Sequence, residues 1–422
     1  MSLAVLELND QSLLIETDQG SQHAEPGFAR LTQEGIETGE EARSSAWEQP
    51  QNSYNQYWNL LNQTPLTANE KWARHHADIA FAQLKHLWQG AGSPESLVML
   101  APGSFTDAQL SLLLGMAAAL PCEPLAVIDS AVAACLEAQQ DTLYIDMQMH
   151  QTVITRCRVA SGKVSITDQE VMPDLGLIQV YNSVARYISN LLIDSARYDP
   201  LHTSKSEQFI FDHIPDWLTH LRWEGEVSAL LETEQGELPF ILRNDDLRRL
   251  VDERLINTRA FIQRHPGCEL VLSQSSALLA GLADDLSVAT EASQGQGIDY
   301  VLTHHPLILE QINGVYRVQS LQRGESSPAP VTGHQRLASH LLHGGSAFPL
   351  RKPVSIRVTA DGLTLSNSLD KEADLALVLR NGVLETLQVA SGLEIVMPAN
   401  CEPGASLSVG GHRLGLIEVQ DG

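Results

Sequence analysis

The amino-acid sequence predicts a mixed α/β protein of 422 residues that ends in a small all-β module. Hydrophobic residues make up 43% of the chain and charged residues 19%, which is typical of a folded globular protein. Two successive segments each begin with paired strands and continue with alternating strands and helices, although they share no sequence identity. Residues 354–419 alternate short apolar and polar runs between glycine-containing turns, which indicates β-strands.

The first segment opens with two apolar runs around four polar residues, which predicts a β-hairpin over 3–16. A polar stretch follows to about residue 63, and apolar residues at helical spacing then return. The further elements expected in this segment are a helix at 69–89, a strand at 96–101, a helix at 107–120 with Thr106 as its N-cap, a strand at 125–128 and an alanine-rich helix at 130–138.

The second segment repeats the pattern with three strands before its first helix. The strands are expected at 141–146, 152–159 and 163–172, and the long amphipathic helix at 176–197. A helix at 244–264, a strand at 269–272 and a helix at 276–283 complete this segment.

Composition divides the chain into four parts. The two α/β segments occupy 1–138 and 139–321. Residues 322–336 are rich in Gly, Ser and Pro, which is typical of a linker. Residues 337–422 form the all-β module.

Charge and cysteine content exclude several classes of partner and compartment. Acidic residues outnumber basic ones by 52 to 27, and such a chain repels phosphate backbones and anionic lipid. We therefore expect neither a nucleic-acid partner nor a membrane partner. The N-terminus has no signal-peptide pattern, and the five cysteines are scattered, so the sequence predicts a cytoplasmic protein with reduced thiols.

The order of elements resembles the actin-like ATPase superfamily, specifically the nucleotide-binding domain of DnaK-type heat-shock chaperones. Residues 98–109, VMLAPGSFTDAQ, are similar to a family segment that reads VTVPAYFNDSQ. Residues 127–134, VIDSAVAA, stand where the family has IINEPTAA. Residues 39–42, GEEA, resemble the family's G-x-x-A. The resemblance covers about residues 1–310 and implies a two-lobed fold with a nucleotide cleft.

The loops that hold nucleotide in this family are replaced in this chain. The first phosphate loop, D-L-G-T-T in the family, is ELNDQ at 7–11, with an acidic Asp10 facing the expected phosphate position. The second, D-L-G-G-G-T, is DMQMHQ at 146–151, and the carboxylate expected near Val153 is missing. The adenosine loop, V-G-G-S-T-R, is LSQSSA at 272–277. Backbone N–H groups approach phosphate closely only where side chains are small, so these loops predict a pseudo-ATPase.

Glu7, Asp146 and Ser275 are the remnants of the family's cofactor-binding residues. The resemblance would give Glu7 and Asp146 a role in holding hydrated Mg²⁺, whereas acids at strand ends are also common where they are simply solvated. Because no phosphate cradle accompanies them, we expect no catalytic residue and no ATP or Mg²⁺ cofactor.

Histidines offer a further hypothesis, a metal site. The adjacent pairs His75–His76 and His304–His305 point to different helix faces and cannot chelate alone. His340 and His343 are placed three apart in an expected helix, but no Cys or acid completes a set. The sequence therefore predicts surface histidines and no metal.

The function expected from the sequence is that of a catalytically inactive DnaK/actin-like protein that binds a protein or peptide partner, as a scaffold or chaperone accessory. The alternative is a divergent ATP-binding, chaperone-like ATPase. A sugar or acid phosphotransferase of the same superfamily is a third possibility, and it would also need the missing loops.

Overall fold

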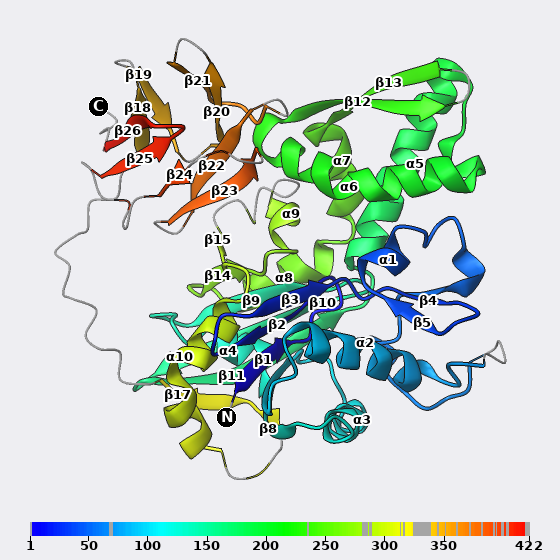
Figure 1. Cartoon of the computed structure of the whole chain (residues 1–422), viewed down its shortest axis with the longest axis vertical. Helices are drawn as coiled ribbons and strands as arrows, with labels where there is room; N and C mark the ends of the chain where they lie inside the picture. The colour runs from blue at the N-terminus through cyan, green and yellow to red at the C-terminus, as the bar shows by residue number, and fades with distance from the viewer. Residues whose placement is uncertain are drawn as a thin grey trace. The chain divides into compact units, whose positions relative to one another are not determined.

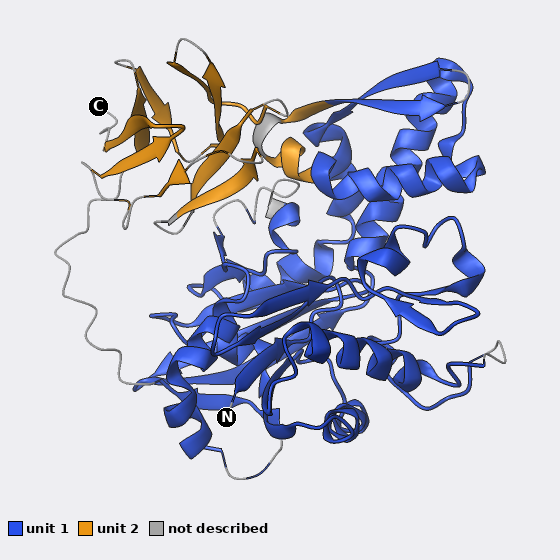
Figure 2. Ribbon diagram, in the orientation of Figure 1, with its two compact units in different colours: residues 1–217, 228–324 blue, residues 218–227, 325–422 orange. Residues whose placement is uncertain are grey.

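The structure is a computed structural model of the whole chain (Figure 1). It describes residues 2–66, 71–233, 236–280, 286, 289–312, 314, 317–323, 339–343, 346–350, 352–359, 362–370, 373–380, 383–390, 393, 395–397, 401 and 405–417. The chain divides into unit 1, residues 1–217 and 228–324, and unit 2, residues 218–227 and 325–422 (Figure 2). In the described part of the chain, no helix is long and apolar enough to cross a bilayer.

Unit 1 contains two six-stranded sheets with closely similar topology (Figure 1). In spatial order, the first consists of β16 (Arg317–Val318), β8 (Glu123–Asp129), β7 (Ser96–Ala101), β1 (Leu3–Glu7), β2 (Leu13–Thr17) and β3 (Gln22–Glu25). The second consists of β15 (Thr290–Glu291), β14 (Glu269–Leu272), β9 (Thr142–Met147), β10 (Thr152–Ala160), β11 (Lys163–Met172) and β17 (Ser320–Gln322).

Five strands of each sheet correspond in order and direction. β1, β2 and β3 are antiparallel neighbours, as are β9, β10 and β11. β7 and β8 continue parallel to β1, and β14 and β15 continue parallel to β9. The sheets differ at the sixth strand, because β16 is parallel to β8 whereas β17 is antiparallel to β11. The turn after β1 and the turn after β9 therefore hold equivalent positions.

Alternation along β1 and β7 sends side chains into two cores. Ala4 and Leu6 belong to a core that the first sheet shares with α2 (His76–Gly90) and α3 (Asp107–Ala118). Leu3 and Val5 face the opposite core, which also contains side chains of the second sheet. The short helix α4 (Ser130–Ala134) and the long helix α10 (Gln296–Glu310) contribute to this second core, so they lie between the sheets.

Unit 1 also contains a small third sheet, a hairpin and several further helices (Figure 1). A small sheet of β5 (Ile36–Thr38), β4 (Ala29–Leu31) and β6 (Ser53–Tyr54) lies next to α1 (Glu40–Arg43) in sequence. The other helices are α5 (Leu177–Ala196), α6 (Ser204–Glu224), α7 (Asn244–Asp252), α8 (Ile256–Arg264) and α9 (Ala277–Ala280). Strands β12 (Glu226–Thr233) and β13 (Gly236–Arg243) form a separate hairpin. The division between the units falls within α6 and within β12.

Unit 2 is built from strands in its described residues after 338, and two sheets share one apolar core. One sheet has the order β19 (Ser346–Pro349), β18 (His340–His343), β26 (His412–Ile417), β25 (Ser406–Val409) and β24 (Ile395–Val396). The other has the order β21 (Gly362–Ser366), β20 (Val354–Thr359), β22 (Leu375–Arg380) and β23 (Val383–Val389). Of the predicted linker at 322–336, Gln322 lies in β17, and 324–336 lie outside the described residues.

Four predicted elements differ from the structure. The alanine-rich helix predicted at 130–138 ends at Ala134. The helix predicted at 69–89 begins at His76, because His75 is extended and forms a β-bridge with Pro65; residues 69 and 70 lie outside the described residues. Leu66 N–H also donates to the Arg74 carbonyl at 2.7 Å. The helix predicted at 244–264 is two helices, with the fully buried Leu255 at the interruption. His340 and His343 lie in strand β18 rather than in a helix, because Leu341 between them is fully buried in the unit 2 core.

Candidate functional site

The turns that follow β1 and β9 meet at the centre of unit 1 and bond directly to each other. The Met149 backbone N–H donates to Asp10 Oδ1 at 2.6 Å. The side-chain amide of Asn9 donates to Asp146 Oδ1 at 2.9 Å and to the Met147 carbonyl at 3.1 Å. We call this set of contacts, formed by residues 9–10 and 146–149, the hairpin junction. Its backbone donor is already occupied by a side chain of the same protein.

Asp10 is held in the hairpin junction by contacts on two sides. Its side chain is buried, and its own carbonyl accepts a 2.7 Å hydrogen bond from the Gly27 N–H. A Cβ at Gly27 would lie 2.5 Å from that carbonyl oxygen, so only glycine permits this approach. Burial raises the pKa of Asp10 to about 7, and the Met149 N–H opposes this shift. The carboxyl is therefore close to half-protonated near neutral pH.

The second turn, which follows β9, is also hydrogen-bonded to the start of α5. The N–H groups of Leu177 and Ile178, at the start of the helix, donate to the carbonyls of Gln148 and Met149, each at 3.0 Å. The first N–H groups of a helix are otherwise free to bind an anion. Here carbonyls of the second turn accept hydrogen bonds from two of these N–H groups.

Three bulky residues of the second turn, Gln148, Met149 and His150, are all buried. Gln148 donates to Asp146 Oδ2 at 3.3 Å, and His150 Nε2 lies 2.8 Å from the Asn55 carbonyl. Met149 joins a small apolar cluster with Phe28 and other side chains. These three side chains therefore pack inside the protein rather than extend into solvent.

Glu7, Asp146 and Ser275 come together around one small cavity of about 50 Å³. Burial, with a smaller contribution from the nearby Asp146, raises the pKa of Glu7 to about 7, and burial also raises the pKa of Asp146. Ser275 Oγ donates to the Met147 carbonyl at 2.5 Å. A cavity of this volume has room for a few waters.

A larger cavity of about 380 Å³ lies beside the hairpin junction, within unit 1. Gln11 and Ser12 line both cavities, and Met149 lines the larger one. This volume falls in the range of small-molecule and side-chain binding pockets. The further residues that line it are Ala24, Glu25, Pro26, Phe28, Glu40, Arg43, Trp47, Leu177, Ile178, Tyr181, Phe211, Asp212, Pro215 and Asp216.

Aromatic stacking and one glutamine connect the two sides of the larger cavity. Trp47, which follows α1, stacks on Phe211 of α6 with ring centroids 4.2 Å apart and planes 15° apart. Gln208 of α6 accepts from the Trp47 N–H at 2.9 Å and donates to the Arg43 carbonyl at 3.1 Å. These contacts hold α6 against the segment around α1.

The larger cavity is acidic. Four carboxyl side chains line it, those of Glu25, Glu40, Asp212 and Asp216, and Arg43 is the one Lys or Arg among its lining residues. Arg43 is paired with Glu40 at 2.6 Å and lies 3.7 Å from Asp212. Burial raises the pKa of Asp212, while Gln208 and Arg43 oppose that shift.

The histidines considered in the sequence are separate from both cavities. His75 precedes α2 with Nδ1 3.3 Å from Asp78 Oδ2. In α10, His304 contacts the Tyr300 ring, and His305 Nδ1 lies 2.8 Å from the Leu302 carbonyl.

The sequence predicted no function for Arg43, Trp47 or Phe211, which line the larger cavity. These residues come from distant segments of the chain and form no motif.

A scan against protein-family models finds no family that matches this chain, and a search of curated proteins finds no relative. A function must therefore be inferred from the geometry of the two cavities and the hairpin junction.

Proposed function

We propose that the protein is a non-catalytic member of the actin/DnaK-type superfamily, and that it binds a basic, partly apolar segment of a protein partner in the cavity of about 380 Å³. Two lines of support come from unit 1. Five strands of each sheet have the same order and direction, which is what a duplicated actin-like lobe requires. The equivalent turns after β1 and β9 face each other, as the two phosphate loops do in that superfamily.

The absence of catalysis is proposed from one observation, the 2.6 Å hydrogen bond from the Met149 N–H to Asp10 Oδ1. A phosphate oxygen would need this donor, and it would also have to approach an acidic side chain. When Asp10 is ionised, above its pKa of about 7, a like charge about 4 Å away costs roughly 4 kcal/mol at an intermediate dielectric. The small cavity of about 50 Å³ beside Glu7 and Asp146 leaves little room for a triphosphate.

The partner chemistry is proposed from the lining of the larger cavity. Aromatic and aliphatic side chains offer apolar contact area, and four carboxyls line the cavity together with a single guanidinium. A cationic side chain next to an apolar one complements this lining, whereas a polyanion is repelled. The net charge of −25 would steer a basic partner toward the protein.

Fluorescence polarisation with three labelled peptides of equal length tests this function. One peptide carries Arg and Trp, one carries Glu and Trp, and one carries Arg without an aromatic residue. We expect saturable binding of the first, weaker binding of the third and none of the second. The double variant Asp212→Asn/Asp216→Asn should weaken the first interaction several-fold.

A matched control separates the cavity from the overall charge. The variant Asp107→Asn/Glu137→Gln removes the same two charges at exposed positions away from the cavity, and it should bind like the wild type. Equal weakening by both double variants would mean that the peptide binds by net charge alone and would overturn the cavity proposal. Saturable binding of Mg·ATP would instead favour the ATP-binding alternative.

A further inference from the structure

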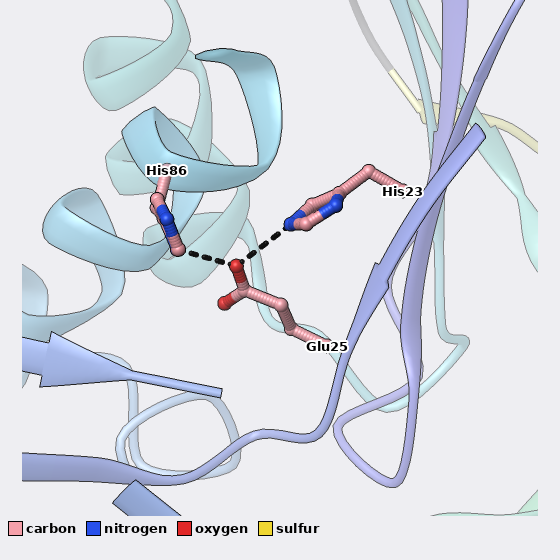
Figure 3. A group of neighbouring side chains, drawn as sticks. All are labelled: His23, Glu25 and His86. Atoms are coloured by element: carbon pink, nitrogen blue, oxygen red, sulfur yellow. Dashed lines mark hydrogen bonds and ion pairs between the residues drawn. The ribbon is translucent and has the colours of Figure 1, made fainter. Parts of the chain in front are cut away.

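Two histidines and a glutamate converge at the outer strand of the first sheet (Figure 3). His23 and Glu25 are two residues apart on β3, so their side chains lie on the same face of the strand. His86 reaches them from α2. His23 Nε2 lies 3.0 Å and His86 Nδ1 2.5 Å from the same atom, Glu25 Oε1. One ligand atom from each residue lies within 4.8 Å of the other two.

The second oxygen of Glu25 is held by two neutral donors. Thr38 Oγ1 and Gln83 Nε2 each donate to Glu25 Oε2 at 3.1 Å. Gln83 is itself oriented, because its Oε1 accepts from Tyr57 Oη at 2.6 Å and from Trp58 Nε1 at 2.8 Å. The hydrogen bonds from Thr38 and Gln83 fix the Glu25 carboxylate, and its Oε1 atom is left to contact the two histidines. Hydrogen bonds of this kind commonly orient the side chains that bind a metal.

Two glycines bring backbone close to this group. A Cβ on Gly39, whose φ is +76°, would lie 3.0 Å from the Glu25 carboxylate. A Cβ on Gly90, the last residue of α2, would lie 2.6 Å from the His23 ring. Neighbouring backbone therefore confines the Glu25 carboxylate and the His23 ring.

A positively charged partner would stabilise the buried carboxylate of Glu25. Its side chain is 5% exposed, and in the described part of the chain no Lys or Arg forms an ion pair with it. Buried carboxylates are usually paired with a cation or coordinate a metal. The side chains of His23 and His86 are 33% and 58% exposed, so an ion can enter from solvent.

We propose that His23, Glu25 and His86 bind a divalent transition metal, with Zn²⁺ as the preferred ion and one coordination position open to solvent. Two imidazoles and one carboxylate form a ligand set typical of zinc sites that keep an open position. The bound ion would connect β3 to α2. It would also stabilise the position of Glu25 at the wall of the larger cavity.

Titration calorimetry of the untagged full-length protein, stripped of metal with EDTA and dialysed, tests this site with ZnCl₂. We expect one equivalent of Zn²⁺ to bind saturably. His23→Asn and His86→Asn should each weaken that binding by at least about tenfold. Both side chains are partly exposed, so the variants should fold, which circular dichroism of the metal-free proteins will check.

Co²⁺ and a control histidine make the test specific. Co²⁺ bound by these ligands should give visible d–d absorption that Glu25→Gln diminishes. His412→Asn, at an exposed position of β26, should leave Zn²⁺ affinity unchanged. The proposal is overturned if the wild type shows no saturable Zn²⁺ binding. It is also overturned if both cluster variants bind Zn²⁺ as tightly as the His412 variant does.

Discussion

The hairpin junction and the larger cavity are neighbours in unit 1. Gln11 and Ser12 line both the larger cavity and the small cavity next to the junction. In the junction, side chains and backbone satisfy one another, and the adjoining cavity measures about 50 Å³. The neighbouring cavity measures about 380 Å³ and is lined by aromatic rings and acids. The space large enough for a ligand therefore lies beside the two turns rather than between them.

The difference has a simple origin in side-chain size and charge. The turn after β9 carries Gln148, Met149 and His150, all buried, and the turn after β1 contributes Asp10. Side chains of this size fill the space that a loop of glycines would leave open. The larger cavity stays open because stacked Trp47 and Phe211 connect its two sides without filling it.

The largest expected effect comes from comparing the mostly buried ion pair of Arg317 and Asp129 with the ion pair of Arg43 and Glu40 at the larger cavity. Arg317, with a side chain 13% exposed, pairs at 2.5 Å with Asp129, which is 0% exposed. Arg317→Met should lower the free energy of unfolding by about 3–5 kcal/mol, because it leaves a buried carboxyl unpaired. Arg43→Met, whose side chain is 26% exposed, should cost about 1 kcal/mol or less. Urea denaturation measures both, and similar costs would contradict this contrast.

A second effect is the pH dependence of stability that Glu7 confers. Its folded pKa is raised to about 7 by burial, from an ordinary value of 4.5. The folded state therefore holds a proton that the unfolded state releases, so stability falls as pH rises from about 4.5 to about 7. Its contribution over that range is on the order of 2–4 kcal/mol.

Glu7→Gln should flatten this part of the stability curve, measured by urea denaturation at several pH values. Glu137→Gln changes an exposed glutamate and should leave the slope as in the wild type. An unchanged slope in Glu7→Gln would show that Glu7 is ionised normally in the folded protein.

A smaller effect is expected from Asp10 itself. Asp10→Ala removes the acceptor of the buried Met149 N–H and should cost about 1–3 kcal/mol, whereas Asp10→Asn keeps a carbonyl acceptor and should cost less. Amide hydrogen exchange at Met149 should accelerate in the alanine variant only. If exchange is equally slow in both variants, the hydrogen bond does not close the junction.

Local patterns predicted much of the fold. Strands 163–172 and 269–272 have the predicted bounds, and Thr106 caps α3 through a reciprocal capping box with Gln109. These elements follow from alternation and capping chemistry, which act within a few residues. The strand at 340–343 was mistaken for a helix because four residues cannot distinguish the two periods, and its pairing with β19 and β26 decides the outcome.

The site could be predicted only where it is local. Asp10 and the residues at 148–150 were identified from the turns that contain them, and all four side chains are buried. The larger cavity and the group of His23, Glu25 and His86 depend on contacts between segments far apart in the chain. No spacing in the sequence reports such contacts, so only the three-dimensional arrangement shows them.

Titration calorimetry with Mg·ATP at pH 8, where Asp10 is largely ionised, tests the central claim most directly. We expect no saturable heat for the wild type, nor for the triple variant Gln148→Gly/Met149→Gly/His150→Gly. Binding should appear only when Asp10→Thr is added to that variant, because both the space and the charge must then favour phosphate. A micromolar Kd for ATP in the wild-type protein would contradict the account of a closed hairpin junction.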